Sequence, residues 1–311
     1  MPHLTHQTGA ACLALTALLT WPAQAADIEF KAVAPGVYAF IGEIDGRSYE
    51  NEALNANIGL VVTPAGAVLI DSGASFNGAR QIAEAARKVS PQEIKWVINT
   101  GGQDHRWLGN GYFKSHGAEI MAHEDAQADM KARALAHLAT LKPVLKEKLA
   151  GTEPVYPTSW LKDSDSRWTF GGVVFEIKHR QGGHTPGDSI VWLPQSNVLF
   201  SGDVVYVDRI LGLHPVSNTK NWLASFAMIE ELKPQTIVPG HGRVTNLPTA
   251  QAQTRDVLVA LRTQCTKAVK VGMDISAAVK GFDATPFKSL KHVEVWMPQL
   301  VNFTYLEIER E

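Results

Sequence analysis

Five places along the chain put a polar side chain directly after an apolar, strand-like run and beside a glycine. They are Asp71, the loop 99–106, His184, Asp203 and His241. Taken singly, each has a simple explanation as a turn or a helix cap. Strand ends hold loop residues rigidly, however, so we expect these five places to converge on one site. Histidine and aspartate together supply the nitrogen and oxygen ligands that metal ions bind.

The segments around these positions alternate between strand-like and helical patterns. The predicted strands are 36–41, 57–62, 67–70, 94–98, 119–122, 168–179, 189–193, 198–201 and 236–238. The predicted helices are 77–90, 124–149, 219–232, 249–271 and 291–309. A β-rich half with a helix is thus followed by a similar half, with no linker between them. Two sheets packed face to face, with helices outside, would bury both sets of strands, so we predict an α/β sandwich formed by residues 26–311 as a single domain.

Composition and charge exclude several classes of protein. The 311 residues are 45% hydrophobic and 19% charged, which is typical of a globular protein. The formal net charge of -2 indicates no basic surface for nucleic acid and no acidic block typical of disorder. Apolar runs after residue 25 are strand-sized, so no membrane span is predicted in the mature chain.

The N-terminus resembles a secretory signal at residues 1–25. An apolar stretch, Ala10–Trp21, precedes Pro22 and the small-residue pattern Ala23-Gln24-Ala25. No Lys or Arg occurs before Lys31, so a hydrophobic N-terminal helix or anchor is the alternative. After cleavage Cys265 is the one remaining cysteine, and the mature monomer can form no internal disulfide. We expect a periplasmic or secreted protein.

The order and local sequence of these motifs resemble the metallo-β-lactamase superfamily, from about Gly36 to His241. The resemblance implies an αββα sandwich, an Asp that orients the metal-binding loop, and then a His-x-His-x-Asp-His loop. A His, a bridging Asp and a final His complete a site for two metals, usually zinc. The four strand-end positions correspond to Asp71, His184, Asp203 and His241. Residues 183–188 and 302–307 are most similar to a periplasmic branch, the SoxH-like or quinoprotein-relay metallohydrolases.

The main motif departs from the family pattern. Aligned on Asn99-Thr100 and Gly109-Asn110, the four ligand positions of the loop hold Gly101, Gln103, His105 and Arg106. Both histidines of the first metal are missing, His105 stands in place of an Asp, and Arg106 in place of a His. A slip of one residue would match Asp104-His105 to the motif's Asp-His. That slip needs an extra residue before Gly109 and recovers neither histidine.

The metal-ligating residues that remain would still hold one metal ion, nearer the second of the family's two metal positions. The predicted ligands are three imidazoles and one carboxylate: His105, His184, Asp203 and His241. This set suits one Zn²⁺, with iron or manganese as alternatives. The ion would lower the pKa of a bound water towards ~7. Asp203 would then orient the nucleophile, and Gln103 or Arg106 would stabilise the oxyanion. A guanidinium stays protonated, so Arg106 is no ligand; it would replace the lost ion's charge.

This interpretation makes the protein an exported hydrolase of an ester, thioester or related bond. A second interpretation is a non-catalytic or redox-accessory protein that binds an anion or an oxidised sulfur compound between Arg106 and His105. Gly101 favours it, because glycine supplies no ligand. A third is a mononuclear iron oxidoreductase, since two histidines and one carboxylate also suit iron. Metal content and sensitivity to chelators distinguish the first two interpretations.

Four further residues are predicted to contact a small-molecule substrate. Tyr49 and Asn51 lie in the polar segment 47–57, where family members carry a flexible flap. His214 follows Asp203 in the chain and would line the pocket, and Trp107 would form an apolar wall or a cation–π partner of Arg106. An anionic substrate would fit Arg106. Whether the protein has a protein partner is not indicated by the sequence.

Overall fold

The structure is a computed structural model that describes residues 28–311. It contains two β-sheets. The first has seven strands in chain order: β1 (Lys31–Ala34), β2 (Val37–Phe40), β3 (Ile58–Thr63), β4 (Gly66–Ile70), β5 (Ile94–Ile98), β6 (Glu119–His123) and β7 (Ser159–Leu161). The second has five strands in the order β12 (Thr236–Val238), β11 (Val198–Phe200), β10 (Ser189–Leu193), β9 (Val173–His179) and β8 (Asp165–Phe170).

Both sheets are mixed, and their parallel strands determine where the site lies. Strands β4, β5, β6 and β7 pair in parallel, as do β11 and β12. The remaining neighbours are antiparallel. Parallel strands bring their carboxyl ends to the same edge of a sheet, so the segments that follow β4 and β5 lie side by side, as do those that follow β11 and β12. Every strand-end motif but that of His184 is on one of these segments, and His184 lies in the connection from β9 to β10.

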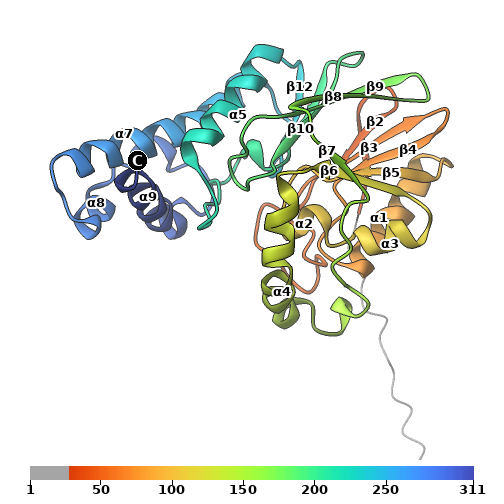
Figure 1. Ribbon diagram of the computed structural model, residues 1–311, viewed down its shortest axis with the longest axis horizontal. Coiled ribbons are helices and arrows are strands. Elements are labelled where there is room, and N and C mark those ends of the chain that lie inside the picture. Colours follow the sequence, from red (N-terminus) through yellow and green to blue (C-terminus); the bar gives the residue numbers. More distant parts are fainter. Residues whose placement is uncertain (1–27) are drawn as a thin grey trace, which may run out of the picture.

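Helices cover the outer faces of both sheets, which confirms the predicted αββα sandwich (Figure 1). Helices α1 (Phe76–Val89) and α3 (Asn110–Ser115) pack on the seven-stranded sheet, and α5 (Thr219–Leu232) packs on the five-stranded sheet. The C-terminal helices form a lobe to one side (Figure 1). That lobe contains α7 (Asp256–Lys270), α8 (Ile275–Gly281) and α9 (Val293–Glu309). The remaining α-helices are α2 (Asp104–Trp107), α4 (Ala126–Leu145) and α6 (Leu247–Ala250).

Apolar side chains on the inner faces of the two sheets form a shared core. Val68 and Ile70 of β4 meet Phe175 and Ile177 of β9 there. Helix α1 shows how local sequence agrees with this packing. Ser75 caps it by accepting a hydrogen bond from the Gly78 amide at 2.9 Å, and its buried face presents small and apolar side chains to the sheet.

Several element boundaries differ from the prediction. The segment 168–179 is a hairpin, β8 and β9, because Gly171 and Gly172 both take positive φ at its turn. The predicted helix 124–149 ends in a separate 3-10 turn, Lys146–Leu149, where Lys146 has a φ of 51°. The loop 99–110 contains α2, while β7 and α8 had no sequence signal that predicted them.

The predicted signal sequence lies outside the described residues, and the single-domain assignment of residues 26–311 stays a prediction. Within residues 28–311, no helix combines the length and hydropathy needed to cross a membrane.

Candidate metal centre and substrate pocket

The strand ends bring Asp71 and the predicted residues of the metal centre together, and these side chains are buried. Asp71 follows β4, and the turn after β5 supplies His105 and Arg106 from α2. Asp203 lies in the 3-10 turn Gly202–Val204 after β11, and His241 follows β12. The fold therefore brings together side chains from a stretch of 171 residues, from residue 71 to residue 241.

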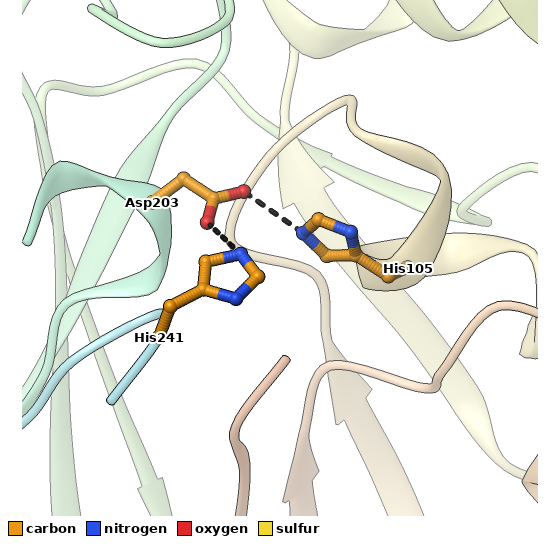
Figure 2. A group of neighbouring side chains, drawn as sticks. All are labelled: His105, Asp203 and His241. Atoms are coloured by element: carbon orange, nitrogen blue, oxygen red, sulfur yellow. Dashed lines mark hydrogen bonds and ion pairs between the residues drawn. The ribbon is translucent and has the colours of Figure 1, made fainter. Parts of the chain in front are cut away.

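Asp203 lies at the centre of this group (Figure 2). His105 Nε2 is 3.1 Å from its Oδ2, and His241 Nε2 is 3.3 Å from its Oδ1. The ligand atoms of these three residues lie within 4.8 Å of one another. His184 adds a third imidazole, with Nε2 3.8 Å from Asp203 Oδ2.

The hydrogen bonds of His184 and His241 leave their Nε2 lone pairs facing the carboxylate. His184 Nδ1 is 3.0 Å from the carbonyl oxygen of Gly212, and His241 Nδ1 is 2.8 Å from that of Asn55. A carbonyl oxygen only accepts, so each Nδ1 carries the hydrogen and each Nε2 a lone pair. Backbone carbonyls commonly orient metal-ligating histidines in this way.

His105 is held differently. Arg47 Nη2 lies 3.0 Å from His105 Nδ1, and arginine can only donate. His105 Nε2 therefore carries the hydrogen and donates it to Asp203 Oδ2. To become a ligand through Nε2, His105 must lose that proton and Asp203 must exchange the hydrogen bond for the ion.

Two observations fit a divalent cation at this place. His184 Nε2 is buried and has no hydrogen-bond partner among the described residues. His241 Nε2 and Asp203 Oδ1 face each other as two acceptors, which repel unless a cation lies between them. A protonated His241 is no substitute at neutral pH, because burial lowers its pKa to about 4. His184, His241 and Asp203, with His105 beside them, form a donor set suited to Zn²⁺.

Arg106 supplies a fixed positive charge behind the carboxylate. Its Nη2 donates to Asp203 Oδ1 at 2.6 Å, its Nε to Oδ2 at 3.1 Å, and its Nη1 to Asp71 Oδ2 at 2.9 Å. An added Cβ on Gly240 would lie 2.6 Å from Nη2, so a glycine is required there. Burial acts to raise the pKa of Asp203, but Arg106 and His105 outweigh it and hold that pKa well below its usual range. Burial raises the pKa of Asp71 to about 6 in spite of Arg106.

Other groups fill the positions of the two missing histidines. An added Cβ on Gly101 would lie 2.5 Å from Asp188 Oδ1, and Asp188 Oδ2 accepts a hydrogen bond from the Thr185 amide at 2.7 Å. Gln103 Oε1 accepts from Arg133 Nη1 at 3.0 Å. The altered loop is therefore packed around its own residues, and at position 101 it leaves no room for a histidine as it stands.

A pocket of about 590 Å³ opens onto this centre. Gln103, His105, His184 and His241 all line it, and so does His214, whose ring lies 4.9 Å from that of His184. The segment 47–57 reaches the pocket through Arg47 and Asn55. The arginines among the residues that line the pocket are Arg47, Arg133 and Arg209.

The other three predicted substrate contacts do not line the pocket. Tyr49 donates a hydrogen bond to Glu147, and Lys148 lies 3.9 Å above its ring. Asn51 is buried and folds its own segment, with bonds to Glu43 and Gly46. Trp107 is fully buried and donates to the Gly102 carbonyl at 3.0 Å. Arg106 is also absent from the wall, since its guanidinium is engaged beneath Asp203.

Sequence reasoning missed several pocket residues, and one pair had a usable signal. Arg133 and His137 lie four positions apart in the predicted helix 124–149, so they share a face of α4. Arg47 pairs with Asp104 across 57 positions, and no local pattern indicates such a contact.

A second group of metal-ligating side chains, His123, Asp125 and His179, has poorer geometry. The two imidazole rings stack with centroids 3.8 Å apart and planes 18° apart. Because each lone pair lies in the plane of its ring, the lone pairs of the two rings lie in nearly parallel planes and do not converge on one ion.

His137 is expected to make the protein sensitive to acid. Both ring nitrogens are buried without a partner among the described residues, and burial lowers the pKa to about 4. The unfolded chain takes up a proton near pH 6.5, so this contribution to stability is present above pH 6.5 and lost as the pH falls towards 4. His137→Leu should reduce the loss of unfolding free energy between pH 7 and pH 4.5 by roughly 2–3 kcal/mol.

Denaturant unfolding at both pH values checks this expectation. His116→Leu, at an exposed histidine outside the pocket, is the matched control. An equal loss in wild-type protein and His137→Leu would contradict it.

The comparison with known proteins identifies the class of this fold and site. The family model of the metallo-beta-lactamase superfamily matches residues 51–241, which is more than half of the chain. The chain belongs to this superfamily of hydrolases, whose members bind divalent metals, usually zinc. The predicted SoxH-like branch stays a prediction.

Individual relatives are distant. The chain is 21% identical to a linear primary-alkylsulfatase of Pseudomonas sp. (strain ATCC 19151) over 69% of its own length and 47% of that enzyme's. It is 22% identical to a metallo-beta-lactamase type 2 of Elizabethkingia meningoseptica, over 74% of this chain and 84% of that protein. The chain thus spans about half the length of the alkylsulfatase that it matches.

Solved structures agree on the fold. The sec-alkylsulfatase Pisa1 from Pseudomonas sp. superimposes with a TM-score of 0.71 and 17% identity, over 89% of this chain and 50% of that one. A metallo-beta-lactamase from Pontibacter korlensis gives a TM-score of 0.59 and 21% identity, over 75% and 99%. Alkylsulfatase and lactamase neighbours together establish the architecture and leave the substrate open.

Proposed function

We propose that this protein is an exported hydrolase that holds one divalent metal ion, zinc first among the alternatives, and cleaves an ester, thioester or related bond of a small anionic molecule. The observation that carries the proposal is the arrangement around Asp203. His184 Nε2 has no hydrogen-bond partner within residues 28–311, and His241 Nε2 faces a carboxylate oxygen at 3.3 Å without a hydrogen between them. Both open onto one pocket.

The residues of the chain divide the chemistry between them. Asp203, His184 and His241 would hold the ion, and His105 would join them. When bound, the ion supplies a Lewis acid and lowers the pKa of water at the site. Arg106 keeps Asp203 ionised and its oxygens in place from behind. Gln103 and Arg47 lie on the pocket wall beside His105, and both donate to Asp104. Either would stabilise negative charge that develops on the substrate by exchanging that contact for the substrate oxygen.

Export and substrate class have separate support. The apolar segment 10–21 and the small residues before position 26 support export to the periplasm or medium. The arginines at the pocket wall support an anionic substrate. Alkylsulfatases among the relatives make sulfate esters the first compounds to screen.

Elemental analysis tests the metal. The chain from residue 26, purified without added metal or chelator, is expected to contain about one equivalent of metal. His105→Ala and His241→Ala should bind it at least tenfold more weakly, since each removes one of the proposed ligands. His116→Ala, at an exposed histidine, should retain it. No metal in wild-type protein, even after supplementation, would refute the proposal.

One observation favours the alternative, a non-catalytic protein that binds anions or sulfur compounds. Arg106 already pairs with both oxygens of Asp203, so the carboxylate is neutralised without an ion. On this alternative the protein purifies without metal, is indifferent to chelators, and still binds anions in the pocket.

A further inference from the structure

Arg209 differs from the other two arginines of the pocket wall. Arg47 forms an ion pair with Asp104, and Arg133 forms one with Asp129. Arg209 has no carboxylate within ion-pair distance among residues 28–311. The two acids with which it interacts at longer range are already paired. Asp203 is bound by Arg106 at 2.6 Å, and Asp45 by Lys291 at 2.6 Å.

The guanidinium of Arg209 is also buried. The residue is 5% exposed, and its Nε and Nη1 have no hydrogen-bond partner among the described residues. A guanidinium stays protonated in proteins, so this group keeps its full charge. Buried charges are normally paired, and an unpaired one costs free energy. An unpaired charge at the wall of a pocket is therefore a position where an arriving anion gains most.

Aromatic rings hold the guanidinium in place without using its hydrogens. Its central carbon lies 4.5 Å from the ring centroid of Trp296 and 5.9 Å from that of Tyr206. These contacts are cation–π interactions. The hydrogens of a guanidinium lie in its plane and are left for an acceptor, which matches a planar or tetrahedral oxyanion.

Two distant parts of the chain build this position. The backbone at Arg209 pairs with Lys291, where the Ile210 amide donates to the Lys291 carbonyl at 2.9 Å. Lys291 lies two residues before the start of α9, which carries Trp296 and Leu300 to the pocket. The C-terminal helices therefore complete a wall that lies beyond the residues matched by the family model.

We propose that Arg209 is the anion-binding residue of the pocket, and that it takes the carboxylate or sulfate-type group of a small organic acid. The apolar part of that acid would lie against Leu213, Pro215 and Leu300, which line the same pocket. The inference rests on the proposed function in one respect only, that the bound acid is the substrate or its product. Arg209 then selects for an anionic substrate, while the centre around Asp203 carries out the reaction.

Calorimetric titration with matched six-carbon probes tests this. Hexanoate and hexanesulfonate carry the two kinds of anion, and hexanamide is neutral with a similar shape. Wild-type protein should bind at least one anion about tenfold or more tightly than hexanamide. In Arg209→Met the preference should vanish while hexanamide binding is unchanged, and Arg209→Lys should retain part of it. Arg87→Met, which removes an exposed charge from α1, should behave as wild type.

The two anions distinguish a carboxylate-type from a sulfate-type substrate, and either preference supports the inference. A wild-type protein that binds all three probes alike would overturn it, as would an unchanged anion preference in Arg209→Met. Metal content is measured in each variant, so that contact between the anion and an ion is separated from contact with Arg209. Should Arg209→Met fail to fold, Arg209→Lys decides the question. It should bind the preferred anion more weakly than wild type with hexanamide binding unchanged, and an unaltered anion preference would overturn the inference.

This measurement is independent of turnover. Failure of the hydrolase proposal means no metal and no cleavage, with Arg209-dependent anion binding intact. Failure of the present inference means no Arg209-dependent preference, whatever the metal content.

Discussion

Replacing Arg106 with methionine is expected to lower the free energy of unfolding by roughly 3–5 kcal/mol, which is the usual effect of removing one partner from a buried ion pair. Arg106 is 1% exposed and donates to Asp71 and Asp203, both of which are also buried. Methionine fills much of the same volume but leaves two carboxylates side by side without a cation. Equilibrium unfolding in denaturant at pH 8 measures the loss.

The deficit should shrink as the pH falls. Burial already raises the pKa of Asp71 to about 6 with Arg106 present, and removal of the cation raises it further. A folded-state pKa above the unfolded value means that the folded variant takes up a proton first, so it gains stability relative to wild type as the pH falls from 8 towards 5. Burial lowers the pKa of His105 and of His241, and Arg106 lowers both further, so its removal raises both pKa values, makes the variant less sensitive to acid, and acts in the same direction.

Arg106→Lys is the control, because it keeps the charge and loses the two-pronged geometry. It should recover part of the stability at pH 8. A Met variant as stable as wild type at pH 8, or one whose deficit is independent of pH, would show that the ion pairs of Arg106 contribute little. Metal analysis of the variant is informative too, because the freed carboxylates could recruit a second cation.

The sequence indicated which strand ends would lie close together, and the reason is physical. Asp71, Asp203 and His241 each follow a buried strand, and parallel pairing forces such ends to one edge of a sheet. A pattern local to each strand therefore carried information on a contact in space. The two-sheet architecture followed from the same alternation of strand and helix.

What the sequence could not predict depends on contacts between distant segments. Arg47 meets His105 across 58 positions and decides which of its nitrogens carries the hydrogen. Arg106 was expected to replace a lost ion's charge, and its burial against Asp71 fits that expectation. Its expected contact with an anionic substrate stays a prediction. Arg209 lines the pocket, whereas Arg106 does not. Such assignments need the burial and pairing of every neighbour, which no motif contains.

Restoring the family's first histidine with Gly101→His is expected to destabilise the protein by roughly 1–3 kcal/mol, in the range for overpacking a filled interior, and to bind no second metal. Even the Cβ of the new side chain would lie 2.5 Å from Asp188 Oδ1. Asp188 is buried and held by Thr185, so it cannot simply rotate away. Thermal unfolding and metal analysis measure both effects.

A double variant distinguishes crowding from other causes. Asp188→Ala removes the carboxylate that meets the new Cβ, so Gly101→His combined with Asp188→Ala should lose less stability than the two single changes added together. Additive losses would mean that Asp188 is not the obstacle. Two equivalents of metal in Gly101→His alone would mean that the loop still has room for the family's first site. The expected result instead makes the altered loop a repacked structure, in which Asp188, Gln103 and Arg106 occupy the space of the lost ligands and leave the metal chemistry to the groups around Asp203.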